Sequence, residues 1–216
     1  MFWVKICGIG SYAAAACAAE QGASAVGFIL TPGFRRSLAP EAAREIIRRL
    51  PPALHKVGVF VDDTPERINA LIDSCGLTMV QLHGHEPPEY LHQVRRPAAR
   101  AIRLQQSADA EQTNRFRTAH MLLLEPYVAG TKGGGLGTSL DPALVHAVRT
   151  RLGLSGAGVP GPLLVLAGGL DPENVAEAIA AAAPDGVDVS SGVETDGTKD
   201  LSKIAAFIAA ARGARV

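Results

Sequence analysis

The chain has 216 residues, of which 47% are hydrophobic and 19% are charged, a composition that excludes an intrinsically disordered protein. Lysine plus arginine and aspartate plus glutamate each total 21, so the formal net charge is zero. This balance provides no broad electrostatic field for nucleic acid or an anionic membrane surface, so we expect neither as a partner. Any anionic ligand must be held locally.

The cysteines and the first residues favour a cytoplasmic protein. Cys7, Cys17 and Cys75 are odd in number, widely spaced and without a CxxC pair, which is typical of reduced thiols in a reducing compartment. The apolar run 1–7 is too short for a signal peptide, and charges or turn residues interrupt every stretch before it reaches about 18 apolar residues. We therefore expect no membrane span.

In chain order, short apolar runs alternate with amphipathic, alanine-rich stretches. The runs that predict β-strands lie at 3–7, 25–30, 56–61, 78–82, 99–104, 120–125, 162–167 and 185–189. The stretches that predict helices lie at 11–21, 39–50, 64–75, 87–95, 108–117, 141–152, 171–182 and 200–212. Three helix starts carry an N-cap residue followed by proline, at Thr64-Pro65, Asp141-Pro142 and Asp171-Pro172.

Repeated strand–helix units predict a (β/α)8 TIM barrel that forms a single domain over residues 1–216. The run 57–61 is typical of parallel strands buried on both faces, because it is apolar almost throughout. The main alternative is an open, doubly wound sheet with one unit miscounted. The weakest strand in that respect is 99–104, which contains Arg100 and Arg103. The glycine- and proline-rich stretch 153–162 is interpreted as a surface loop, not a domain linker.

Polar residues and glycines follow nearly every predicted strand, which indicates an enzyme because such barrels place the active site there. On the first strand, Lys5 and Cys7 share a side by alternation and are expected to face the interior. A buried ammonium beside a thiol lowers the thiol pKa and would make Cys7 a base or nucleophile. The alternative is that Cys7 is a small core residue, as Cys17 and Cys75 are expected to be.

The ends of the last two strands predict a phosphate site. Gly168 and Gly169 follow the seventh strand, and Ser190, Ser191 and Gly192 follow the eighth. Glycine lets the backbone approach a phosphate and hydroxyls donate to it. Barrels often bind phosphate between these two loops.

Gln81 and His83, at the end of the fourth strand, are interpreted as hydrogen-bonding groups facing the barrel mouth. A metal site at 83–86 is not expected, because a third ligand with suitable spacing is missing. Glu125 ends the apolar run 121–124, where a carboxylate is costly to bury unless it is used or paired. Partial burial would raise its pKa and suit a general acid, whereas an exposed position beyond the strand is the alternative.

The long glycine-rich loop 129–138 lacks the Gly-Lys-Ser/Thr ending of a P-loop, so we interpret it as a mobile lid over the site.

These strand ends resemble the phosphoribosylanthranilate isomerase family of tryptophan biosynthesis along nearly the whole chain. Several ordered motifs are more specific than any one alone. The similar motifs are Lys5-Ile6-Cys7-Gly8, Gly27-Phe28-Ile29-Leu30 with Arg36, Val57-Gly58-Val59-Phe60, Gln81-Leu82-His83-Gly84, Leu166-Ala167-Gly168-Gly169-Leu170 with Pro172-Glu173-Asn174-Val175, and Asp188-Val189-Ser190-Ser191-Gly192-Val193-Glu194.

The resemblance implies an Amadori rearrangement of N-(5-phosphoribosyl)anthranilate to 1-(2-carboxyphenylamino)-1-deoxyribulose 5-phosphate. The acid that matches Glu125 assists opening of the sugar ring to a Schiff base, and the thiolate that matches Cys7 removes the C2′ proton. The family usually has aspartate where this chain has Glu125, threonine where it has Gly10, and a different sequence at 138–142. The chemistry implies neither a metal nor an organic cofactor.

The resemblance also implies how the substrate is held. Arg36 would pair with the anthranilate carboxylate through its guanidinium fork. The loops that hold Gly169 and residues 190–192 would bind the phosphate, with Asp188 near the sugar hydroxyls. Lys5, Gln81 and His83 complete the expected substrate-binding set.

Two other functions remain open at this point. A paralogous barrel could act on another sugar phosphate, although an aldolase would need a Schiff-base lysine at a strand end, where neither Lys5 nor Lys132 lies. A non-catalytic sensor of a phosphorylated ligand is the other. In every case we expect a small phosphorylated ligand and a monomer or homodimer.

Overall fold

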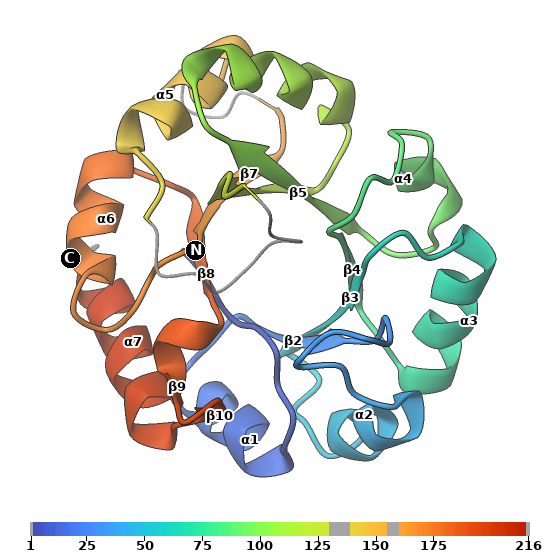
Figure 1. Ribbon diagram of the computed structural model, residues 1–216. Helices are drawn as coiled ribbons and strands as arrows, with labels where there is room; N and C mark the ends of the chain where they lie inside the picture. Colours follow the sequence, from blue (N-terminus) through green and yellow to red (C-terminus); the bar gives the residue numbers. More distant parts are fainter. Residues whose placement is uncertain (1, 130–138, 155–159, 215–216) are drawn as a thin grey trace.

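The computed structural model describes residues 2–129, 139–154 and 160–214. Its parallel strands form a closed barrel in sequence order, with β1 paired to both β2 and β8 (Figure 1). The predicted TIM barrel is therefore confirmed, and the open-sheet alternative is wrong. The strands are β1 (Trp3–Ile6), β2 (Ala25–Ile29), β3 (His55–Phe60), β4 (Met79–Leu82), β5 (Ala98–Leu104), β6 (Met121–Pro126), β7 (Leu163–Ala167) and β8 (Gly186–Val189).

Helices form an outer ring around the strands, and α7 packs beside α1 (Figure 1). A hairpin of β9 (Glu194–Thr195) and β10 (Thr198–Lys199) follows β8 after the short 3₁₀ turn η2 (Ser191–Val193). The outer helices are α1 (Tyr12–Glu20), α2 (Pro40–Ile47), α3 (Pro65–Cys75), α4 (Tyr90–Gln93), the 3₁₀ helix η1 (Ser107–Phe116), α5 (Pro142–Arg151), α6 (Val175–Ala182) and α7 (Leu201–Gly213).

Two of the three proline-marked helix starts are confirmed. The Thr64 hydroxyl accepts a hydrogen bond from the Arg67 amide, and the Asp141 carboxylate accepts one from Ala143. The third is wrong, because the Asp171 carboxylate closes a turn by accepting from the amides of residues 173 and 174, and α6 begins only at Val175.

Two other predicted helices differ in form. The stretch 87–95 contains only the single turn α4. The stretch near 108–117 is the 3₁₀ helix η1 instead of an α-helix. We have no physical account of that difference. Residues 130–138 of the proposed lid 129–138 and residues 155–159 of the loop 153–162 lie outside the described residues.

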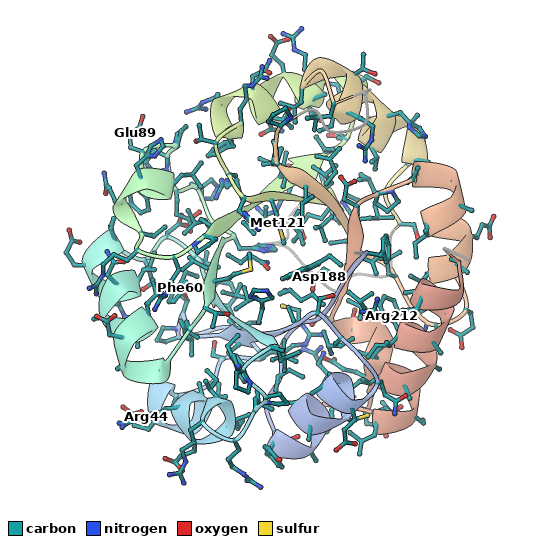
Figure 2. The ribbon with its side chains drawn as sticks, turned by 180° about the vertical axis from the view of Figure 1, so that it is seen from behind. Arg44, Phe60, Glu89, Met121, Asp188 and Arg212 are labelled. Atoms are coloured by element: carbon teal, nitrogen blue, oxygen red, sulfur yellow. The ribbon has the colours of Figure 1, made fainter. Side chains whose placement is uncertain are left out.

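The core has two layers, one inside the barrel and one between barrel and helices. Figure 2 shows Met121 and Asp188 within the ring of strands, whereas Arg44 and Glu89 lie at the outer edge. Phe28 and Phe60 are fully buried in the outer layer, where each such side chain contributes about 2–3 kcal/mol to folding. The inner layer consists of Ala25, Val57, Met79, Ala99, Ala101, Met121, Leu123, Val165 and Ala167.

The strand that sequence favoured least, β5, spans seven residues. Arg100 is buried there and pairs with the carboxylate of Glu86, while its Nη2 donates to the carbonyl of Gly84 at 2.9 Å. Arg103 has the parity of the inward-facing Ala101. Its guanidinium pairs with the carboxylate of Glu125, so each charge in this strand has a partner, which a buried strand requires.

Within the described part of the chain, no helix combines the length and apolarity needed to cross a bilayer.

Candidate active site

A cavity of about 240 Å³ lies at the barrel mouth, bounded by the loops that follow the strands. Most of the residues selected from sequence meet there. Lys5 lies beneath the cavity and Gly192 beside it, so neither lines it. The selected residues that line it are Cys7, Arg36, Gln81, His83, Glu125, Gly168, Gly169, Asp188, Ser190 and Ser191.

Lys5 and Asp188 are register partners on β1 and β8, and their side chains form a buried ion pair. The Nζ of Lys5 donates to Oδ1 of Asp188 at 2.9 Å. Gly27 on β2 leaves room for this pair, because a Cβ there would lie 2.9 Å from the Cys7 sulfur and 3.1 Å from the Lys5 nitrogen. The ends of β1 and β8, with the room left by Gly27 of β2, thus bring an ammonium, a carboxylate and a thiol together at the floor of the cavity.

The expected lowering of the Cys7 pKa is wrong. Burial raises the pKa of the thiol, Lys5 opposes that rise, and the charge of Asp188 adds to it, so the pKa lies above the ordinary value. The physical reason is that the Lys5 ammonium is shared with Asp188 and neutralises that carboxylate first. Burial also lowers the pKa of Lys5, but Asp188 and Cys7 outweigh it and keep the ammonium charged.

Glu125 lies within β6 and is only 3% exposed, so the alternative of an exposed residue beyond the strand is wrong. Its Oε1 lies 3.1 Å from Nε2 of His83 and accepts a hydrogen bond from Nε of Arg103 at 3.0 Å. Burial alone would raise the pKa of Glu125, but His83 and Arg103 together lower it below the ordinary value. The expected rise is therefore also wrong, and the carboxylate is ionised at neutral pH.

Gln81 extends this contact into a chain across the mouth. Its Nε2 lies 2.8 Å from Nδ1 of His83, and Nε2 of the same imidazole faces Oε1 of Glu125. Arg103 was not selected from sequence. It lies two residues after the inward-facing Ala101 on β5, and this alternation could have indicated that its side chain also faces the barrel interior.

The loops after β7 and β8 pack closely at the other side of the cavity. Gly168 and Gly169 have φ angles of 86° and 64°, a left-handed pair that side chains disfavour, and Asn174 Nδ2 donates to the Gly169 carbonyl at 2.8 Å. A Cβ on Gly192 would lie 1.9 Å from the carbonyl oxygen of Leu170. Gly192 therefore lets the two loops touch.

A cluster of charges borders the loop after β8. Arg36 donates from Nε and Nη2 to the Glu194 carboxylate at 2.5 and 2.9 Å. Lys199 and Arg35 donate to the same carboxylate at 2.8 and 2.7 Å. Burial alone would raise the pKa of Glu194, but Arg36 and Lys199 lower it to about 2. Sequence reasoning did not assign a role to Glu194 or Lys199. Arg36 and Glu194 are 158 positions apart in the chain, whereas Lys199 lies five residues from Glu194.

Hydrogen bonds and an ion pair organise the segment 83–86. The Glu86 carboxylate accepts from the amides of Asp62 and Gly84 and pairs with Arg100. His85 is exposed, and its Nδ1 lies 3.3 Å from Oδ2 of Asp62. Among the described residues, no three histidine, cysteine or carboxylate side chains form a group suited to a metal ion.

Three comparisons place this chain among known proteins. The family described as N-(5′-phosphoribosyl)anthranilate (PRA) isomerase matches residues 4–210. A relative from Symbiobacterium thermophilum named N-(5′-phosphoribosyl)anthranilate isomerase is 50% identical, with 98% of each chain covered.

Solved structures agree with that similarity. The phosphoribosyl anthranilate isomerase from Thermotoga maritima superposes with a TM-score of 0.87 at 39% identity, covering 99% of this chain and all of that one. Another such structure, in complex with reduced 1-(o-carboxyphenylamino)-1-deoxyribulose 5-phosphate, has a TM-score of 0.84 and 38% identity, with 99% of this chain and 100% of the other covered.

Proposed function

This chain belongs to the N-(5′-phosphoribosyl)anthranilate isomerase family, and we propose that Cys7 and Glu125 act in it as general base and general acid. It is an isomerase of tryptophan biosynthesis that converts N-(5-phosphoribosyl)anthranilate to 1-(2-carboxyphenylamino)-1-deoxyribulose 5-phosphate by an Amadori rearrangement. The observation that carries the proposed roles is that both side chains line one cavity, between Arg36 and the loops after β7 and β8.

The cavity lining supports one orientation of the substrate. The phosphate binds the loops at 168–169 and 190–191, where two left-handed glycines and two hydroxyls border the cavity. Gly192 shapes that site by letting the loops touch. The anthranilate carboxylate binds Arg36, and the sugar hydroxyls lie over the buried pair of Lys5 and Asp188.

Ring opening is the first chemical step. Glu125 donates a proton to the ring oxygen, the bond between C1′ and that oxygen breaks, and the nitrogen lone pair forms a protonated Schiff base at C1′. Gln81 and His83 hold the carboxyl group in place, because His83 contacts one of its oxygens and Gln81 fixes the imidazole.

Proton abstraction follows. The Cys7 thiolate removes the proton from C2′, and the electron pair of that bond forms the C1′=C2′ double bond of an enolamine while the Schiff-base nitrogen becomes neutral. The enolamine then tautomerises: the C2′ hydroxyl loses its proton, C1′ gains one, and the ketone forms. Each step transfers only protons and rearranges electron pairs of the substrate, with no net oxidation or reduction, so we propose that no cofactor takes part.

The protonation states of the two groups are reversed in the resting site. Burial raises the pKa of Cys7, whereas His83 and Arg103 outweigh burial and lower that of Glu125, so at neutral pH the site holds a thiol and a carboxylate. The productive form, a thiolate with a carboxylic acid, contains the same number of protons. Its population is therefore independent of pH between the two apparent pKa values. One turnover returns the pair to the resting thiol and carboxylate.

We also propose that the protein is a single-domain, cytoplasmic enzyme that works as a monomer or homodimer. The cytoplasmic assignment is supported by the three cysteines, because none of them forms a disulfide among the described residues.

The function is tested by the turnover of phosphoribosylanthranilate, generated in the assay and followed by the loss of its fluorescence. Wild type is compared with Glu125→Gln, which retains a polar group of similar size. We expect turnover by wild type and a loss of at least about 100-fold in the variant. A well-folded wild type without turnover would contradict the function, and a fully active variant would contradict the acid role of Glu125.

A further inference from the structure

Glu194 is the common partner of three cationic side chains at the edge of the cavity. Its Oε1 accepts from Nε of Arg36 and Nζ of Lys199, and its Oε2 accepts from Nη2 of Arg36 and Nη2 of Arg35. The Glu194 side chain is 6% exposed and that of Lys199 is 5% exposed, so this is a built cluster and not a solvated surface pair.

We propose that Glu194 is a positioning residue for substrate binding, which turns the Nη1–Nη2 edge of the Arg36 guanidinium toward the substrate carboxylate. The inference rests on the proposed role of Arg36. Glu194 occupies the edge formed by Nε and Nη2, so the donors left for a second carboxylate are both hydrogens of Nη1 and one of Nη2. One arginine then bridges two carboxylates, one from each end.

The backbone around both residues holds this geometry. Gly8 has a φ of 73°, and a Cβ there would lie 2.6 Å from Cδ of Arg36, so the arginine stem packs directly on the loop after β1. Glu194 pairs in register with Lys199 in the β9–β10 hairpin, and Lys203 of α7 donates to its carbonyl at 2.9 Å. The stem and the carboxylate are thus fixed independently, and their contact sets the direction of the guanidinium.

The charges make the positioning role separable from simple electrostatics. Three cations share one carboxylate, which leaves two positive charges in excess beside a site for a phosphate and a carboxylate. Replacing Glu194 by Gln removes a negative charge, so a purely electrostatic role predicts tighter binding of every anionic ligand. A positioning role predicts weaker binding, and only of ligands that carry the anthranilate carboxylate.

The test compares two ligands by calorimetry, 1-(2-carboxyphenylamino)-1-deoxyribitol 5-phosphate and its phenylamino counterpart without the carboxyl group. In wild type, the Kd of the phenylamino ligand divided by the Kd of the carboxyphenylamino ligand measures the contribution of the carboxylate. In Glu194→Gln we expect that ratio to fall about tenfold, with binding of the phenylamino ligand not weakened. In an Arg36→Met background, the same Gln substitution is expected to change the ratio less than about twofold, because Glu194 acts through Arg36.

Each other outcome overturns the inference. Equal weakening of both ligands would show a merely structural role, and tighter binding of both would show an electrostatic one. If Glu194→Gln does not fold, Glu194→Asp gives the same test, because it keeps the charge and shortens the reach to Arg36. A wild-type ratio near one would overturn the role of Arg36, and the inference with it. The isomerase function itself is decided separately, by wild-type turnover of phosphoribosylanthranilate.

Discussion

Arg103 and Glu125 are register partners on β5 and β6, and Nε of Arg103 donates a hydrogen bond to Oε1 of Glu125 at 3.0 Å. This contact joins the strand end that carries the proposed acid to the neighbouring strand. Together with His83 it keeps the pKa of Glu125 low despite its burial. The proposed acid is therefore held mostly in its ionised form, and under the proposed mechanism the rate depends on how readily it takes up a proton.

Replacing Arg103 by Met is expected to move the acid limb of the pH profile of kcat/KM to higher pH, by about one unit. Arg103 favours the carboxylate, so its removal raises the pKa of Glu125, and protonation of the resting pair then begins at higher pH. The measurement is kcat/KM from pH 4 to 10. Arg96→Met, at an exposed position before β5, is the matched control. A limb that moves to lower pH would contradict this account.

Gly27→Ala is expected to lower kcat at least about tenfold, because the new methyl group displaces Cys7 or Lys5. The added Cβ would lie 2.9 Å from the Cys7 sulfur, and Lys5 cannot retreat without loosening its contact with Asp188. Overpacking of this kind also costs about 1–3 kcal/mol of stability. Gly10→Ala is the control, since a Cβ at Gly10 meets nothing within 4 Å. Wild-type kcat and stability in Gly27→Ala would contradict the tight packing around the thiol.

The free energy of unfolding should depend on pH through Glu194. Its pKa in the folded protein is about 2, below the ordinary value of 4.5, so its stabilising contribution is present above pH 4.5 and is lost as pH falls toward 2. Urea denaturation of wild type and Glu194→Gln at pH 6 and pH 3 measures this. Wild type is expected to be more stable at pH 6, with a smaller difference at pH 3. A larger stability difference between wild type and Glu194→Gln at pH 3 than at pH 6 would contradict the lowered pKa of Glu194.

Much of the fold and part of the site could be predicted because they depend on local pattern. Apolar runs separated by capped helices predicted every barrel strand, and alternation placed Lys5 and Cys7 on one side of β1. Strand ends are where a parallel barrel gathers functional groups. The same rule pointed to Gln81, His83 and Glu125, which the structure brings to one cavity.

The pKa directions could not be predicted, because they depend on which residues of other strands lie opposite. Asp188 shares the charge of Lys5 only through the register of β8 on β1, and Arg103 reaches Glu125 through the register of β5 on β6. Neither register is visible in the sequence. The contact between Arg36 and Glu194 spans 158 positions for the same reason.

The most direct test of the proposed mechanism is kcat of Cys7→Ser, with Cys17→Ser as the matched control on α1. Serine keeps the size and hydrogen-bonding capacity at position 7 but is too weak a base to remove the C2′ proton. The account predicts that kcat of Cys7→Ser falls by about 100-fold to 10,000-fold, while Cys17→Ser stays within about twofold of wild type, because the Cys17 sulfur lies on α1 and donates to the Leu201 carbonyl. A folded Cys7→Ser enzyme with wild-type kcat would contradict the assignment of Cys7 as the base.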